Sequence, residues 1–279
     1  EAAGGGGKRG RETRVPAIRF EDVSFRYPGR DDDVFMNLNL VVEPGESVAI
    51  VGENGVGKTT LIKLLAGFYR PSAGRVLIDG IDLDELDLVA WRRRLGVIFQ
   101  DFVHFELSAR DNIALAGLDE PGVDEDARAA AQAAGASEII ETLPSGWDSM
   151  LSRNYTGGAE LSGGQWQRVA LARALFAARR GAQVLVLDEP TANLDVHAET
   201  ELFDQLLEHA RGMTAIVISH RYSTVRRAAR IVVLADGGVI EDGGHDSLLA
   251  LDGVYARLYR LQADRFVMPD ASPRQDPNR

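Results

Sequence analysis

One octapeptide constrains the fold of this chain more than any other feature: Gly52-Glu53-Asn54-Gly55-Val56-Gly57-Lys58-Thr59. It fits G-x-x-x-x-G-K-[ST] at every fixed position, which is the spacing of a phosphate-binding loop. The apolar residues before it predict a short strand at 47–51, and those after it predict a helix at 61–65. The glycines let backbone N–H groups curl around phosphate oxygens, while the helix presents its positive end to the anion. A glycine-rich turn that happens to precede a lysine does not account for both neighbours.

The loop also predicts a binding set for a nucleoside triphosphate. Lys58 is expected to reach the β- and γ-phosphates, and Thr59 is expected to give its hydroxyl oxygen to Mg²⁺. By itself the motif indicates only a P-loop nucleoside triphosphatase (NTPase). The residues expected to bind the nucleotide here are Gly52, Glu53, Asn54, Gly55, Val56, Gly57, Lys58, Thr59 and Thr60.

A second element, residues 184–189, predicts a buried strand that ends in two carboxylates. Ligands of open α/β sheets bind at the carboxyl ends of the strands. Asp188 is therefore a candidate Mg²⁺ ligand, acting through water, and Glu189 is a candidate to orient or deprotonate an attacking water. An apolar strand followed by Asp-Glu is common on its own. Its combination with the loop at 52–59 favours the catalytic interpretation.

The composition bounds the class of protein. The 279 residues are 45% hydrophobic, enough to bury the core of one large domain or two small ones. Lys and Arg number 31 against 42 Asp and Glu, and the formal charge of -11 argues against nonspecific nucleic-acid binding, although a local basic groove stays open. The absence of cysteine excludes disulfides and thiolate chemistry. No apolar run approaches the ~18–20 residues that a bilayer-crossing helix needs.

Three segments are expected along the chain. Residues 1–16 are glycine-rich and basic and predict a flexible linker, and residues 265–279 are polar and predict a disordered tail. Residues 17–264 alternate strand and helix patterns, which indicates a mainly parallel sheet covered by helices. Within residues 17–264, the ranges 17–100 and 166–264 form the expected core, and about 101–165 form an expected helical insertion. Because the chain begins with Glu1 and not Met, we expect a piece of a longer polypeptide or a processed product.

The pentapeptide Leu161-Ser162-Gly163-Gly164-Gln165 separates this chain from most phosphate-loop enzymes. It resembles the signature of ATP-binding cassette (ABC) proteins and lies, as theirs does, between the two nucleotide motifs. Physically it predicts a second anion site, since a serine hydroxyl and glycine amides open the helix predicted at 165–178. An ordinary serine N-cap explains Ser162 but not Gly163, Gly164 and Gln165 together.

Four further positions are assigned only by this resemblance. It implies that Tyr27 stacks on adenine, that Gln100 reaches Mg²⁺ and the attacking water, and that His220 contacts the γ-phosphate. Asp195 belongs to a segment that resembles the loop crossing the dimer interface, although Asn193 departs from the small residue often seen there. Taken alone, Tyr27 would more often be an ordinary strand residue and His220 a capping or packing side chain.

The resemblance covers about residues 18–262 and implies the fold. This is an α/β fold: a P-loop NTPase core with a mainly parallel sheet, an N-terminal antiparallel β region and a helical subdomain that bears the signature. Three segments resemble the exporter branch, namely Asp111-Asn112-Ile113, His220-Arg221-Tyr222-Ser223-Thr224-Val225 and Gly243-Gly244-His245. The segment at 156–160 only partly reproduces the exporter element that touches the membrane domain.

In this family two ATPase domains pack head to tail, and each ATP lies between the phosphate loop of one and the signature of the other. The resemblance therefore implies ATP and Mg²⁺ as cofactors and a second ABC ATPase domain, identical or not, as partner. It also implies a transmembrane domain, expected on the same parent chain, and a place at the cytoplasmic face of the membrane. Nucleic acid is not an expected partner.

Two other functions within the same family compete with that of an exporter ATPase. The alternative is a stand-alone ATPase subunit of an importer or other multi-subunit transporter. A soluble family member acting on DNA or ribosomes is disfavoured by the acidic balance and by the lack of long coiled-coil arms between Thr59 and Leu161.

Overall fold

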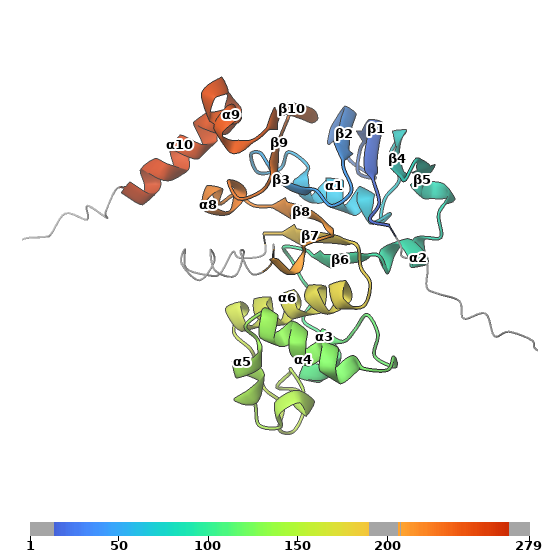
Figure 1. Cartoon of the computed structure of the whole chain (residues 1–279), viewed down its shortest axis with the longest axis vertical. Helices are drawn as coiled ribbons and strands as arrows, with labels where there is room; N and C mark the ends of the chain where they lie inside the picture. The colour runs from blue at the N-terminus through green and yellow to red at the C-terminus, as the bar shows by residue number, and fades with distance from the viewer. Residues whose placement is uncertain (1–13, 190–205, 207, 268–279) are drawn as a thin grey trace, which may run out of the picture.

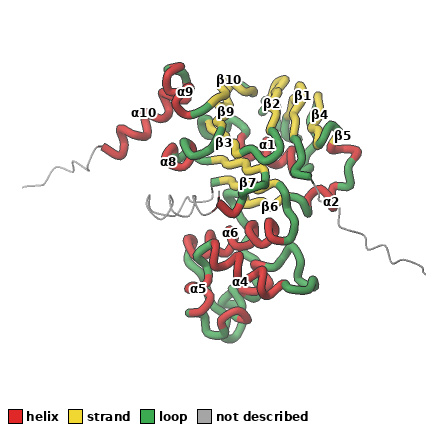
Figure 2. The backbone as a smooth tube through the Cα atoms, viewed as in Figure 1, coloured by secondary structure: helices red, strands yellow, loops and turns green. Residues whose placement is uncertain are grey.

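The computed structural model describes residues 14–189, 206 and 208–267. The predicted linker at 1–16 and tail at 265–279 lie mostly outside these residues. Two sheets and a group of helices make up the described fold (Figure 1). Figure 2 shows the strands gathered in one half of the molecule and helices α4, α5 and α6 in the other.

The larger sheet carries the phosphate loop. Its order is β10-β9-β3-β8-β7-β6, in which only β10 runs antiparallel to its neighbour. The strands are β3 (Ser47–Val51), β6 (Leu95–Ile98), β7 (Val184–Asp188), β8 (Thr214–Ile218), β9 (Arg230–Ala235) and β10 (Gly238–Gly243). This confirms the α/β class predicted from the alternating pattern.

The central strands are buried on both faces, which explains why they read as unbroken apolar runs. In β7, Val184 and Val186 point into one core, while Leu185 and Leu187 point into another. Strands β3 and β9 divide their side chains in the same way, with Ile50 and Val232 on one face and Val51 and Val233 on the other. The period of two along each strand therefore distributes one sheet among three hydrophobic clusters.

The smaller sheet is antiparallel and N-terminal, as the resemblance implies. Its order is β2-β1-β4-β5, from strands β1 (Ile18–Phe25), β2 (Phe35–Val42), β4 (Ala73–Ile78) and β5 (Ile81–Asp82). Helix α1 (Lys58–Leu65) shares one core with both sheets, since Leu61 and Leu65 cluster with Phe20 and Val48. The phosphate loop that leads into α1 is thereby held against two sheets at once.

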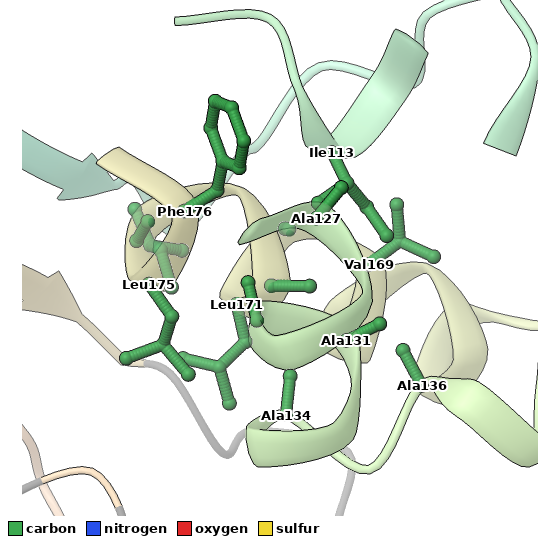
Figure 3. Close-up of a cluster of buried hydrophobic side chains, with 14 of the residues drawn as sticks. Ile113, Ala127, Ala131, Ala134, Ala136, Val169, Leu171, Leu175 and Phe176 are labelled. Carbon is green, nitrogen blue, oxygen red and sulfur yellow. The ribbon is translucent and has the colours of Figure 1, made fainter. Parts of the chain in front are cut away.

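The helical insertion packs against the other face of the large sheet. Within the predicted bounds of about 101–165 it contains α3 (Ala109–Ile113), α4 (Val123–Ala133) and α5 (Ser137–Glu141), and it ends at the start of the long helix α6 (Gly163–Arg179). Small residues of α4 let it approach α6 closely: Ala127 and Ala131 lie against Val169 and Leu171 (Figure 3). The α6 helix also packs closely against β6. A Cβ added to Gly96 of β6 would lie only 2.9 Å from the carbonyl oxygen of Ala174 of α6. Helix α6 therefore joins the insertion to the core.

Several elements carry no clear sequence signal and were not predicted individually. They include β2, β10, the short helices α2 (Leu88–Arg92) and α8 (Tyr222–Val225), and the C-terminal helices α9 (His245–Leu251) and α10 (Val254–Val267). Helix α10 continues three residues past position 264, where the sequence sets the end of the ATPase domain. Among the described residues, no helix is both long and apolar enough to span a bilayer.

We expect Leu171→Ala to destabilise the helical insertion strongly. Leu171 is fully buried in the α4–α6 core, and removing a buried leucine side chain typically costs about 2–5 kcal/mol. The free energy of unfolding from urea titration measures the effect. Leu251→Ala is the matched control, because Leu251 is 64% exposed and its truncation should change stability by less than about 0.5 kcal/mol. Equal losses in the two variants would contradict the assigned core.

Candidate functional site

A cleft of about 1460 Å³ opens at the carboxyl ends of β3, β7 and β8. It brings together most of the predicted nucleotide residues. Those that line it are Tyr27, Gly52, Asn54, Gly55, Val56, Gly57, Lys58, Thr59, Thr60, Gln100, Asp188, Glu189 and His220. A volume of this size accommodates a nucleoside triphosphate.

The phosphate loop wraps around a buried lysine. Lys58 Nζ donates to the carbonyl oxygens of Gly52 and Glu53, both at 2.8 Å, although the Glu53 residue does not line the cleft. Burial lowers the pKa of Lys58, while the neighbouring Glu189 and Asp188 carboxylates oppose that shift. The ammonium is thus held by two neutral acceptors and can exchange them for phosphate oxygens.

Two glycines of the loop have no room for a side chain. Gly57 has φ of 101°, and a Cβ there would come within 2.6 Å of Val34 and 2.8 Å of the Phe35 ring. A Cβ on Gly52 would meet the Leu234 carbonyl oxygen at 2.4 Å. Any side chain at these two positions would push the loop away from the residues on which it packs, which explains the glycines of the motif.

Asp188 and Thr59 form the candidate magnesium site. The Thr59 hydroxyl donates to Asp188 Oδ2 at 2.7 Å. Asp188 is 1% exposed, and its Oδ1 makes no hydrogen bond to any described residue. Burial raises the pKa of Asp188, and the Thr59 hydrogen bond opposes this. A buried carboxylate oxygen without a donor, next to a hydroxyl, fits a Mg²⁺ site, since this ion prefers oxygen ligands.

Glu189 follows β7 in a strained conformation. Its φ of 51° is positive, whereas the other five non-glycine residues with positive φ in the described chain are all Asp or Asn. A backbone hydrogen bond of 2.9 Å to the Ile218 carbonyl holds it there. The carboxylate Oε1 consequently lies 3.2 Å from His220 Nδ1, so the candidate base and the candidate switch histidine meet at the cleft.

Tyr27 stands at the other end of the cleft. Its hydroxyl shares a hydrogen bond of 2.9 Å with the Thr60 Oγ1, and Phe25 and Tyr69 pack edge-on against its ring at 5.0 and 5.2 Å. These contacts fix the ring plane at the mouth of the phosphate loop. The position suits an aromatic that stacks on a base.

Gln100 is exposed at the cleft, and the segment after it is tied to α6. Arg173 of α6 donates to the main-chain oxygens of Asn112 and Val103, and His104 stacks on Trp166 with ring centroids 4.3 Å apart. Burial lowers the pKa of Arg173 to about 10. The segment that follows Gln100 is therefore held against the helix that carries the signature.

The signature residues lie at the start of α6 and do not line the cleft. The Ser162 hydroxyl accepts from the Gln165 amide, and the Ser162 amide donates to Gln165 Oε1 at 2.8 Å, which completes a capping box. Ser162 and Gly163 are exposed, and a Cβ on Gly164 would meet nothing within 4 Å. Packing inside this chain does not require Gly164. Asp195 lies outside the described residues.

The cleft also contains residues that no motif pointed to. Arg30, Asp32 and Asp33 come from the loop between β1 and β2, beside Tyr27, and Ser219 precedes His220. Leu258, Leu261 and Gln262 come from α10. Their sequence surroundings give no signal, because only the tertiary fold carries α10 back to the carboxyl end of β8.

Comparison with known proteins identifies relatives of the whole described fold. A family model described as ABC transporter matches residues 35–192. The chain is 45% identical over 256 residues to an ATP-dependent lipid A-core flippase of Alkalilimnicola ehrlichii, covering 92% of this chain and 42% of the flippase. It is 45% identical over 259 residues to the cyclolysin secretion/processing ATP-binding protein CyaB of Bordetella pertussis, covering 91% of this chain and 35% of CyaB.

A solved structure agrees with these relatives. The structure of a bacterial Atm1-family ABC exporter with ATP bound superposes with a TM-score of 0.81 at 37% sequence identity. The match covers 89% of this chain and 42% of the exporter chain. The chain thus spans less than half the length of each of these proteins.

We expect Glu189→Gln to bind ATP normally and to lose steady-state hydrolysis. General-base assistance is typically worth ~10²–10⁴-fold in rate, and an amide cannot accept the proton. Phosphate release measures turnover, and calorimetry measures ATP affinity. Glu85→Gln is the control for the same chemical change at an exposed position away from the cleft. Near-normal turnover of Glu189→Gln would contradict the assignment of Glu189 as the residue that activates the attacking water.

Tyr27→Ala should weaken ATP binding by about 1–3 kcal/mol, the usual contribution of base stacking on an aromatic. Tyr27→Phe should keep the affinity, because it loses only the hydrogen bond to Thr60 and retains the ring. GTP should bind with modest discrimination, since stacking uses only a π-face. Calorimetric titration of the wild type, Tyr27→Ala and Tyr27→Phe measures the affinity of each for ATP and GTP. Unchanged affinity in Tyr27→Ala would make Tyr27 an ordinary packing residue.

Proposed function

This chain belongs to the ABC transporter family, and we propose that it is the ATP-hydrolysing motor of an exporter that works by pairing head to tail with a second ABC ATPase domain. One observation carries the proposal. The cleft holds the phosphate loop and both carboxylates but none of Ser162, Gly163, Gly164 and Gln165. A nucleotide bound there would expose one side of its phosphates, and an exposed helix start elsewhere on the surface is suited to cover it.

The chemistry within one chain follows from the geometry. Lys58 and the loop amides would bind the β- and γ-phosphates, and Thr59 with Asp188 would hold Mg²⁺. When bound, the ion neutralises charge that develops on the phosphate oxygens. Glu189 would orient or deprotonate the attacking water, while His220 and Gln100 would contact the γ-phosphate and the water from either side.

The opposing chain would supply the second half. The first turn of α6 offers the exposed backbone of Ser162 and Gly163 and the positive end of a 17-residue helix, a suitable site for the exposed γ-phosphate. The bare Gly164 surface would permit close approach of the partner. We assign Asp195 to the same interface from its sequence pattern. Closure on ATP and reopening after hydrolysis would form a ligand-driven two-state switch.

The functions named for the relatives support the exporter assignment. The named relatives are a flippase and a secretion ATP-binding protein, and the solved structure is an exporter, which favours export over the importer-subunit alternative. We propose a transmembrane domain as partner, on the same parent chain, with this domain at the cytoplasmic face of the membrane. Arg173 connects the segment after Gln100 to α6, and this connection would transmit closure between the ATPase domain and the transmembrane domain.

Mixing two inactive variants tests the composite site. Lys58→Ala should be inactive because it cannot hold the phosphates, and Ser162→Arg because it obstructs the facing chain's ATP. In a mixed dimer both lesions fall in one site and the other site is intact. Mixing should therefore restore ATP-driven association, measured by light scattering at high protein concentration, and hydrolysis if one site suffices.

The matched control mixes Lys58→Ala with Lys58→Glu. Every dimer of this pair lacks a working phosphate loop in both sites, so association should stay at the level of the separate variants. Failure of the first mixture to associate or hydrolyse, with both variants shown to be folded, would refute the head-to-tail homodimer. A heterodimer with a different ABC ATPase domain would then be the partner to test.

A further inference from the structure

The C-terminal helix α10 reaches the switch histidine through one side chain. Gln262 Nε2 donates to the His220 carbonyl oxygen at 2.8 Å, and the Tyr222 amide donates to Gln262 Oε1 at 2.7 Å. One carboxamide therefore bridges the backbone on both sides of Arg221. The two partners lie 40 and 42 positions away in sequence, so this is a tertiary clamp and not a local turn.

The helix that carries Gln262 is fixed at its other end. The Glu241 carboxylate of β10 accepts the amides of Val254 and Tyr255 at the start of α10. A Cβ on Gly253 would lie 2.2 Å from Glu241 Oε1, so a side chain at this position would have to displace the carboxylate. The fully buried Tyr255 also shares a hydrogen bond of 2.7 Å with His245 Nδ1 of α9. The start of α10 is thus anchored to the sheet.

The switch segment packs on the same helix. Tyr222, 8% exposed, lies edge-on to Tyr255 and Tyr259, with ring centroids 5.4 and 5.8 Å apart. Figure 1 shows α8, which begins at Tyr222, on the same side of the molecule as α10. Aromatic packing and the Gln262 clamp therefore restrain the residues that follow His220 against one rigid support.

The His220 side chain itself is held less firmly. It is 51% exposed, and its imidazole lies 3.2 Å from Glu189. Ser219 shapes the turn from within, since its hydroxyl accepts the Arg221 amide at 3.0 Å. The direction in which the imidazole points into the cleft depends on the backbone at 220, and the Gln262 carboxamide is bonded to that backbone.

We propose that Gln262 is a positioning residue for ATP hydrolysis: through the His220 carbonyl and the Tyr222 amide, α10 holds the switch histidine where it meets the γ-phosphate. The inference rests on the role proposed above for His220. It gives the C-terminal helix a direct part in turnover, so a partner that displaced α10 from the switch segment would slow hydrolysis without touching the nucleotide.

Gln262→Ala in the 279-residue chain should lower kcat by roughly five- to fiftyfold, the effect of losing two neutral hydrogen bonds that matter in the transition state. Because both bonds are also present without nucleotide, Tm should fall by roughly a few degrees. ATP affinity should stay unchanged. Gln262→Glu keeps an acceptor for the Tyr222 amide but turns an oxygen toward the His220 carbonyl, so its kcat should be at least as low. Arg260→Gln is the control, because it removes only an exposed ion pair of the same helix.

A double-mutant cycle separates positioning from a general structural role. If Gln262 acts through His220, single-turnover hydrolysis by the double variant Gln262→Ala/His220→Ala should equal that of His220→Ala alone. Losses that multiply would overturn the inference, as would a normal kcat in Gln262→Ala. A loss of folded protein at the assay temperature, or of ATP affinity, large enough to account for the lower turnover would also overturn it. Full turnover in His220→Ala would instead refute the proposed role of the histidine, which is a distinguishable result.

Discussion

The parallel pairing of β3, β8 and β7 is the constraint on which the rest of this structure depends. Ile50 of β3 and Asp188 of β7 both pair with Ile218 of β8, so the three strands end at the same level. The phosphate loop, the two carboxylates and the switch segment all begin there. A slip of one residue in either pairing would turn Asp188 away from Thr59, because successive side chains alternate between the faces of the sheet.

This register places buried charges where they are only partly compensated. Lys58 and Asp188 are 8% and 1% exposed, and burial shifts the pKa of each toward its neutral form. The loop carbonyls and Thr59 satisfy part of their bonding capacity. Burying a charge is costly unless it is fully paired, so a triphosphate with its cation would complete what the fold leaves incomplete.

Two helices support segments that adjoin the cleft. One of them, α6, carries the signature and holds the segment after Gln100 through Arg173. The other, α10, holds the segment after His220 through Gln262. Both supports use a polar side chain on a helix to grip the backbone of a catalytic loop, which restrains the loop while leaving its side chains free to meet the nucleotide.

The sequence by itself determined the chemistry and the core architecture of this protein. A phosphate loop needs glycines at fixed spacing, and a double-faced strand needs an unbroken apolar run, so Gly52 to Thr59 and Val184 to Asp188 were legible as linear patterns. A serine N-cap at Ser162 was also readable from the sequence, because its hydrogen bond connects residues only three apart. The return bond from the Ser162 amide to Gln165, which completes the capping box, was not predicted.

Only the tertiary structure decided what depends on contacts between distant segments. No local pattern indicates that Glu189 meets His220, that Asp188 keeps one oxygen without a donor, or that Gln262 returns to the switch segment. The position of helix α10 follows from the Glu241 anchor and the packing of Tyr255. Local propensity acts over one or two helical turns, whereas these positions are set by burial and hydrogen bonding across the whole domain.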